Sequence, residues 1–382
     1  MYKTIEELVT RIDEKNSDGT VSELIGVSID KCFIKSVANT NGTDLSKYKI
    51  IRKNDFALSL MQVSRDGKIP VARLEEYEEA IMSPAYPIFR VKDKNVILPE
   101  YLEMWFKRPE FDREAAFIAV GGVRGSMPWE EFAKMKLPVP PIEKQRKIVN
   151  AYKIVTDRIA LKQKINDNLA NTEQLILYQA ISKNQTIPLS LNEIAEFIDG
   201  DRGKNYPTFD EFSTSGFCLF LNASNVTSSG FNFDSCMFVT EEKDKIMRNG
   251  HLLLNDIVFT SRGTLGNVAL YDKNIKYKNV RINSGMLIIR PKGINLSPYF
   301  IYALLKSNYM KSAIEQFRSG SAQPQLPIKD LQNITFDIPE SQNVLDDLEH
   351  RFFEIEETIS INKREIGNLS ELASILLARL SR

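Results

Sequence analysis

Two long stretches of the chain carry apolar residues at alternating intervals of three and four positions. The first follows the proline-rich segment Leu137–Gln145 and then contains neither proline nor glycine for about 40 residues. Because proline disfavours a helical conformation in its predecessor, we expect one uninterrupted helix to begin just after this segment. The spacing is typical of a coiled-coil seam, and Asn166 is expected to fix its register from a buried position or, alternatively, to face solvent. The predicted seam residues are Tyr152, Val155, Ile159, Asn166 and Leu169.

The end of the chain repeats this pattern at a shift of about 200 residues. Ile159 aligns with Ile359, and Asn168-Leu169 aligns with Asn368-Leu369. A seam that stays in phase along both stretches indicates an internal duplication. The seam residues predicted for the second helix are Phe352, Ile355, Ile359, Asn362, Ile366 and Leu369. Leu175, Leu177 and Leu377 flank the two seams, and we expect them to be exposed, which would limit the solubility of the isolated chain.

Each long helix follows a segment of short apolar runs and turns, which indicates a globule. The pair Asn54-Asp55 recurs as Asn255-Asp256 in the second globule. We therefore predict an α+β fold with two globules of mixed α/β type, separated by two long antiparallel coiled-coil helices in a pseudo-twofold repeat. The expected boundaries are 1–141, 142–184, 185–340 and 341–382. The expected elements include a helix at 4–11, strands at 22–28, 57–63, 88–91, 256–261, 268–271 and 287–290, and helices at 99–107, 191–197 and 297–306.

The order of these parts predicts how the helices run. The first helix carries the chain to the second globule, so pairing of the two seams requires the second helix to run back toward the first globule. A helix of about 40 residues spans roughly 60 Å. The pair would then act as a ruler, with the C-terminus beside the first globule.

Composition narrows the class of protein. The chain has 382 residues, is 43% hydrophobic and 26% charged, and has a formal net charge of zero, which argues against a uniformly basic nucleic-acid binder. A local basic face remains, because the segment from Lys243 to Lys292 carries an excess of roughly seven positive charges. Three cysteines and two histidines are scattered without metal-ligand spacing, and no signal peptide or long apolar span is present. We expect no bound metal and a cytoplasmic location.

Three loops of the second globule carry a family resemblance. They are Asp199–Pro207, Ser261–Gly266 and Ser319–Leu326. Together with the Leu137–Gln145 step and the repeated architecture, they resemble the specificity (S) subunit of type I restriction–modification enzymes over essentially the whole chain. The first globule lacks a counterpart of the Asp199–Pro207 loop, and the second helix lacks the double proline at its start.

The resemblance implies a DNA-binding, non-catalytic subunit. Each globule would be a target-recognition domain that reads one half of a bipartite sequence in double-stranded DNA. The helices would set the spacer and dock two methyltransferase (M) subunits, and motor-nuclease restriction (R) subunits would join the assembly. S-adenosylmethionine, ATP and magnesium would be bound by those partners, and no cofactor by this chain.

The candidate DNA contacts are polar and cationic residues that we expect to lie at the surface, on the loops of the two globules. Arginine pairs with guanine and glutamine with adenine, although each of these residues could equally be a solvated turn residue. In the second globule the candidates are Arg202, Lys204, Asn205, Tyr206, Arg262, Thr264, Arg281, Gln323 and Gln325. By repeat logic, those in the first globule are Arg65, Lys68, Arg73, Arg124 and Ser126.

Two alternatives belong to other classes. A stand-alone nuclease or methylase needs a catalytic motif, and the sequence has neither a P-loop nor an Asn/Asp-Pro-Pro-Tyr/Phe motif. Asp234 with Glu241–Lys243 resembles an Asp…Glu-x-Lys set, which arises readily by chance at this charge density. A DNA-free coiled-coil scaffold is the other alternative, but it leaves the divergence between the two globules unexplained.

Overall fold

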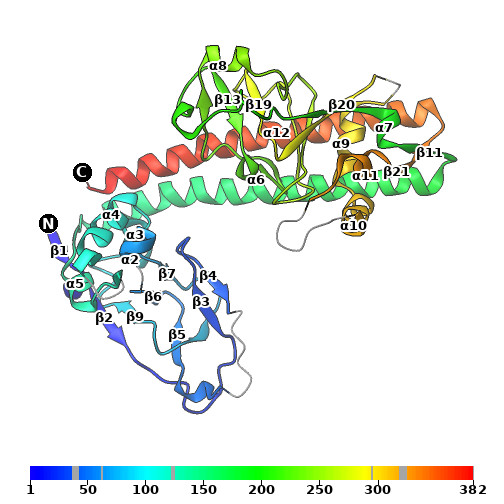
Figure 1. The fold of residues 1–382 in the computed structure, drawn as a ribbon. Coiled ribbons are helices and arrows are strands. Elements are labelled where there is room, and N and C mark those ends of the chain that lie inside the picture. The colour runs from blue at the N-terminus through cyan, green and yellow to red at the C-terminus, as the bar shows by residue number, and fades with distance from the viewer. Residues whose placement is uncertain (37–42, 62, 122–124, 294–295, 318–324, 382) are drawn as a thin grey trace. The chain divides into compact units, whose positions relative to one another are not determined.

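The chain forms two compact units in the computed structural model, which describes residues 1–36, 43–61, 63–121, 125–293, 296–317 and 325–381 (Figure 1). Unit 1 comprises Met1–Ala160 and Gly367–Arg382, and unit 2 comprises Leu161–Ile366. Each unit holds one globule and a stretch of both long helices, α6 (Ile142–Lys183) and α12 (Gln342–Ala378). The predicted α+β class with two globules and two long helices is confirmed.

Unit 1 is organised around an antiparallel four-stranded sheet with the order β2-β9-β6-β7. Two further strand pairs, β3-β4 and β5-β8, extend the globule, and β1 pairs with β10 at the start of α6. The strands are β1 (Tyr2–Thr4), β2 (Val9–Ile12), β3 (Ile25–Val27), β4 (Phe33–Lys35), β5 (Lys49–Arg52), β6 (Phe56–Leu58), β7 (Val71–Arg73), β8 (Glu79–Met82), β9 (Ile88–Val91) and β10 (Lys136–Pro138). The helices are α1 (Ile5–Leu8), α2 (Val63–Asp66), α3 (Pro99–Phe106), α4 (Pro109–Ile118) and α5 (Trp129–Lys134).

Unit 2 repeats this sheet as β12-β20-β17-β18 and the first pairing as β11-β21. It differs in the second layer, where β13 pairs with β16 and, in parallel, with β19. The strands are β11 (Thr186–Ser190), β12 (Ala195–Asp199), β13 (Cys218–Leu221), β14 (Val226–Thr227), β15 (Gly230–Phe231), β16 (Phe238–Val239), β17 (Ile257–Thr260), β18 (Val268–Leu270), β19 (Val280–Ile282), β20 (Met286–Pro291) and β21 (Thr335–Pro339). The helices are α7 (Leu191–Ile194), α8 (Glu241–Ile246), α9 (Pro298–Lys306), α10 (Asn308–Phe317) and α11 (Ile328–Gln332).

The first helix of each globule is short and is capped in the same way. The backbone N–H of Thr4 donates to Glu7 Oε2 at 2.7 Å, and that of Ser190 donates to Glu193 Oε2 at 2.8 Å. The helix predicted at 4–11 therefore ends at Leu8, because the next four residues pair with β9 as strand β2. The helix predicted at 191–197 ends at Ile194 for the same reason, since β12 follows and pairs with β20.

A buried aspartate at the start of the central strand is the most exact repeat between the units. Asp55 and Asp256 are each 1% exposed. Arg90 Nη2 lies 2.8 Å from Asp55 Oδ2, and Arg290 Nη2 lies 2.7 Å from Asp256 Oδ2. The residue before each aspartate is an asparagine with φ of 71°, a left-handed turn that asparagine tolerates better than most residues. The turn and the ion pair together mark equivalent positions immediately before β6 and β17.

The seam residues of the long helices are buried or half-buried, as their spacing predicts. In unit 2 the second half of α6 and the first half of α12 run side by side and antiparallel (Figure 1), with Asn166 facing Asn362 and Glu173 close to Glu356 through Lys306. In unit 1 the C-terminal residues of the chain pack into the core of the N-terminal globule, where Leu380 is 5% exposed. The expected return of the C-terminus is confirmed.

Two of the three leucines expected to be exposed beside the seams are buried. Leu177 is 2% and Leu377 is 8% exposed, whereas Leu175 is 55% exposed as predicted. The reason is that the globules cover the helix ends: Leu177 belongs to the core of unit 2 and Leu377 to the core of unit 1.

Candidate nucleic-acid interface

The loop after β17 in unit 2 holds its backbone rigidly and leaves two side chains at the surface. The N–H groups of Ser261 and Arg262 both donate to the carbonyl of Gly285, at 3.0 and 3.2 Å, and Ser261 Oγ donates to the same oxygen at 3.1 Å. Thr260 Oγ1 ties the far side of the loop to the Thr264 carbonyl. Arg262 and Thr264 are exposed, and within the described residues no ion pair or side-chain hydrogen bond occupies the Arg262 guanidinium.

The segment after α10 joins this loop. Arg262 and Gln325 form an antiparallel β-bridge, and the Leu326 N–H donates to the Ser261 carbonyl at 3.2 Å. Gln325 is exposed beside Arg262. Gln323 lies outside the described residues. The structure therefore brings together an arginine and a glutamine that the sequence places more than sixty positions apart.

The Asp199–Pro207 loop contributes a second arginine to the same region. Arg202 Nη2 pairs with Asp199 Oδ2 at 2.9 Å and donates to the Ser284 carbonyl at 3.4 Å. A Cβ on Gly200 would lie 2.2 Å from the Asn283 carbonyl oxygen, so glycine is required where this loop crosses the 283–285 turn. This turn, which sequence reasoning missed, carries both arginine loops.

Of the other predicted residues in the Asp199–Pro207 loop, one lies at the surface and two contact the body of the globule. Lys204 is exposed at the tip of the loop. Tyr206 is half-buried, and its ring packs edge-on against Phe220 with 5.6 Å between centroids. Asn205 Nδ2 donates to the Ile246 carbonyl at 3.4 Å. Tyr206 and Asn205 therefore hold the loop to the globule, leaving Lys204 for outside contact.

Arg281 does not belong to the exposed surface predicted for it. It is 6% exposed, and its Nε lies 2.5 Å from Asp244 Oδ1 while Nη2 donates to the Met247 carbonyl at 3.1 Å. Burial is the largest single influence on Asp244 and opposes its ionisation, but the hydrogen bonds from Arg281 and Cys218 and the positive charge of Arg281 together lower the pKa of that carboxyl. Reaching DNA would break this ion pair, so we remove Arg281 from the candidate contacts.

In unit 1 the same correction applies to Arg73. It is 8% exposed and is surrounded by acceptors, with Glu103 Oε2 at 2.8 Å from Nε and Asn54 Oδ1 at 2.8 Å from Nη1. Its guanidinium also pairs with Glu75. With Glu100 Oε1 at 3.8 Å from Nη1, three acidic residues surround this guanidinium, an arrangement that the sequence alone could not show.

The other candidates of unit 1 lie near α2. Arg65 and Lys68 are exposed, and Arg65 pairs with Asp66 at 2.8 Å. Arg124 lies outside the described residues. Gly125, which precedes Ser126, has φ of +72°, and a Cβ there would lie 2.4 Å from Ser64 Oγ. Glycine therefore allows the segment containing Ser126 to pack against α2.

The predicted basic segment of unit 2 keeps only part of its charge at the surface. Arg281 forms an ion pair with Asp244, and Arg290 forms one with Asp256. The exposed cations that remain are Lys245, Arg248, Arg262, Lys273, Lys276, Lys278 and Lys292.

The residues weighed as a nuclease set form ordinary ion pairs. Glu241 pairs with Lys245 at 2.7 Å, and Lys243 pairs with Glu211 at 2.8 Å. Across the described part of the chain, no three His, Cys, Asp or Glu side chains gather in a way that could hold a metal ion. The described helices also include none that is long and apolar enough to cross a membrane.

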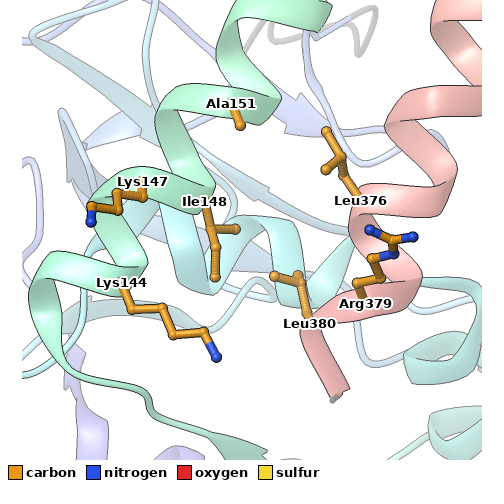
Figure 2. A pocket seen from close by; sticks show the side chains of 7 residues that line it. All are labelled: Lys144, Lys147, Ile148, Ala151, Leu376, Arg379 and Leu380. Atoms are coloured by element: carbon orange, nitrogen blue, oxygen red, sulfur yellow. The ribbon is translucent and has the colours of Figure 1, made fainter.

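The helix pair presents apolar surface of its own. Leu161, Ile165 and Leu175 of α6 are 59%, 38% and 55% exposed and lie on one face of the helix, away from the seam. In unit 1 a groove of about 500 Å³ lies between the start of α6 and the end of α12. Figure 2 shows apolar side chains lining this groove with cationic side chains at its edges. Its lining residues are Lys144, Lys147, Ile148, Ala151, Leu376, Arg379 and Leu380.

The sequence matches the family described as "Type I restriction modification DNA specificity domain" over residues 30–171 and 188–366. The two matched ranges correspond to the two halves of the repeat. The chain belongs to this family of type I restriction–modification specificity proteins. Its function is recognition of DNA, and the resemblance seen in the loops is confirmed.

Two relatives illustrate the likeness. The type I restriction enzyme MjaIX specificity subunit of Methanocaldococcus jannaschii is 21% identical over 304 residues, which cover 75% of this chain and 69% of that protein. The crystal structure of a type I restriction–modification system S subunit from M. genitalium matches with a TM-score of 0.61 and 17% identity, covering 100% of this chain and 96% of that one. At this identity the second comparison shows the shared fold of the specificity subunits.

Proposed function

We propose that each globule of this specificity subunit reads one part of a bipartite DNA target, and that unit 2 reads its part through Arg262 and Gln325. The observation that carries this proposal is the exposed Arg262 guanidinium on a loop whose backbone is braced by Gly285. An arginine that is held in place but has no intramolecular partner among the described residues is ready to pair with a base edge. Bidentate pairing with guanine O6 and N7 is the commonest specific arginine contact in the major groove.

The neighbouring side chains supply complementary contacts. Gln325, bridged to Arg262, can pair with the N6 and N7 edge of adenine. Arg202 and Lys204 lie on the adjoining loop, and Asp199 holds the Arg202 side chain in one orientation. Such cations position a protein on the phosphate backbone without carrying sequence information. Base reading is therefore assigned to Arg262 and Gln325, and phosphate contact to Arg202 and Lys204.

We further propose that the long helices set the distance between the two parts of the target and dock two methyltransferase subunits. The exposed apolar face of Leu161, Ile165 and Leu175 and the groove at Ile148 and Leu380 support partner binding, because apolar patches of this kind mark protein interfaces. Methylation and ATP-dependent cleavage would then take place on the methyltransferase and restriction subunits. S-adenosylmethionine, ATP and magnesium would be bound there.

The test is a binding experiment on the complex of the full-length chain with its methyltransferase partner, using a duplex that contains the target found by methylation mapping. Arg262→Ala should weaken binding by about 5- to 150-fold, the range for loss of a good bidentate base contact, and should relax one base position. Arg351→Ala is the control, because this arginine is half-exposed on α12 and pairs only with Asp347 among the described residues. Unchanged affinity and unchanged base preference in Arg262→Ala would refute the assignment.

A further inference from the structure

The repeat gives Arg262 a counterpart in unit 1, and that counterpart is Met61. In the central strands Phe56 pairs with Phe89 of β9, while Ile257 pairs with Ile289 of β20. The aspartates that precede these strand residues, Asp55 and Asp256, bind Arg90 and Arg290 in the same way. β6 and β17 are therefore in register at a shift of 201 positions.

The same register continues into the loops beyond the strands. The Ser59 N–H donates to the Pro70 carbonyl at 2.9 Å, and the Thr260 N–H donates to the Asn267 carbonyl at 2.9 Å. One residue further, the carbonyl of Leu60 accepts from the Met127 N–H at 2.9 Å. The carbonyl of Ser261 accepts the corresponding bond from Leu326 at 3.2 Å. The residue after each of these carbonyls is Met61 in unit 1 and Arg262 in unit 2.

Met61 is a large apolar residue whose side chain lies at the surface of unit 1. Its exposed fraction is 62%. It lines a cavity of about 320 Å³ together with Ser59, Ser83 and Tyr86. An exposed thioether side chain leaves apolar surface in contact with water. Binding of a partner that covers this side chain is therefore favoured by the burial of apolar surface. The position that presents a cation in unit 2 thus presents an apolar group beside hydroxyls in unit 1.

We infer that Met61 reads the 5-methyl group of a thymine in the part of the DNA target that unit 1 recognises. This inference rests on the proposed function and extends it to the second reading surface. The thymine methyl is the one apolar group that the major-groove edges of the base pairs present, and proteins recognise it through apolar contact. Ser59, Ser83 and Tyr86 line the same cavity as Met61, and hydroxyl groups can exchange hydrogen bonds with the polar edge of a base pair. The two globules would then share a loop position and use it for opposite chemistry.

The test uses the complex of the full-length chain with its methyltransferase partner. Methylation mapping first gives the target, and Arg262→Ala identifies the part that unit 2 reads. Each thymine in the other part is then replaced, one at a time, by deoxyuracil, which lacks only the methyl group. The proteins compared are the wild type, Met61→Ala and Met61→Leu.

One thymine should show coupling to Met61. Its replacement should weaken wild-type binding by about fourfold, the effect of losing one buried methyl group. Met61→Ala should bind the thymine duplex more weakly by at least that factor and show no further loss with deoxyuracil. Met61→Leu should keep most of the wild-type difference. Replacing thymines in the part read by unit 2 should give no coupling to residue 61.

The outcomes separate this inference from the proposal on which it rests. A bipartite target in which no thymine couples to Met61 would refute the inference and leave the proposed function standing. Equal weakening on every duplex would also refute it, because Met61 would then support the loop or wedge between bases and not read a methyl group. A target without two separate parts would refute the proposed function itself.

Discussion

Asn362 on α12 donates a hydrogen bond to Asn166 on α6, with 2.8 Å between Nδ2 and Oδ1. Lys162 donates to Asn362 Oδ1 at 2.8 Å and pairs with Glu365 at 2.7 Å. Asn362 is only 7% exposed, so these bonds lie within the seam. A buried polar cluster of this kind is satisfied in one alignment of two helices and broken in others. It accounts for how an otherwise repetitive seam selects one antiparallel register.

Asn362→Ala should lower the free energy of unfolding by about 1 kcal/mol, since it removes two hydrogen bonds and leaves Asn166 without this partner. Asn362→Leu should instead keep or raise that free energy while allowing more than one register. Denaturant unfolding measures the first effect, and disulfide trapping between the helices detects mixed registers in the second. Asn368→Ala is the matched control, because Asn368 is exposed on the same helix. A single register in Asn362→Leu would contradict the role of the cluster.

Glu173 predicts a pH dependence of the stability of unit 2. It is 0% exposed, and one carboxyl oxygen of Glu173 and one of Glu356 accept from Lys306 Nζ, at 2.7 and 2.6 Å. Tyr302 stacks under this ammonium, with 4.6 Å from Nζ to the ring centroid, and Lys363 and Asp272 also face the cluster. Burial raises the pKa of Glu173 from 4.5 to about 8, against the attraction of Lys306 and with help from Glu356.

The direction of the effect follows from proton binding. Between pH 4.5 and about 8 the folded protein keeps a proton on Glu173 that the unfolded chain has released. This contribution to stability is therefore complete below pH 4.5 and is lost as the pH rises through about 8. The melting temperature of the full-length chain should fall over this interval, and Glu173→Gln should flatten the fall. Glu349→Gln, an exposed change on α12, should leave it unaltered. A constant difference between wild type and Glu173→Gln at pH 5, 6, 7 and 8 would contradict the assignment.

Arg290 and Asp256 predict a large loss of stability when one partner is removed. The Asp256 carboxylate is buried, receives two bonds from Arg290 and accepts the Leu253 N–H at 2.7 Å. Arg290→Met leaves this charge without its counterion, which costs about 3–5 kcal/mol for buried pairs. Thermal unfolding should show a melting temperature lower by roughly 6–20 °C.

The double variant Asp256→Asn with Arg290→Met tests whether the loss of stability comes from the unpaired charge of Asp256 or from the missing arginine side chain. The amide keeps the acceptor for Leu253 but carries no charge, so the double variant should recover part of the stability lost in the single one. An Arg290→Met protein as stable as the wild type would show that the pair contributes nothing.

Local pattern predicted much of the fold. The long helices, their seams and the repeated Asn-Asp turn follow from spacing within short stretches, and the helix bounds Ile142–Lys183 and Gln342–Ala378 follow the proline steps before them. The short first helices were predicted too long, because strand pairing of Val9–Ile12 with β9 outweighs local helical preference.

The site was less accessible to sequence reasoning because it depends on contacts between distant residues. Arg73 and Arg281 look like surface cations until Glu103 and Asp244 are placed beside them. The 283–285 turn that holds both arginine loops has no motif apart from its glycine. The sequence alone does not indicate that Met61 is equivalent to Arg262. This equivalence follows from the register of β6 and β17 in their sheets.

Inserting one heptad into each long helix, at opposed positions within 161–175 of α6 and the facing part of α12, tests the helices as a spacer. Seven residues add about 10 Å while keeping the seam in phase, which corresponds to about three base pairs at roughly 3.4 Å each. Methylation mapping should show the same two base sequences with a longer unread interval. An unchanged interval in a methylating complex would mean that the helices do not set this distance.

The central claim is that two globules read two separate parts of one DNA target. Its most direct test is methylation mapping in cells that co-express this chain with its methyltransferase partner, before and after residues 1–141 are exchanged for those of another family member. We predict a bipartite methylated motif with a fixed unread interval, in which the exchange alters one part and leaves the other unchanged. A motif without two parts, or an exchange that alters both, would contradict the account.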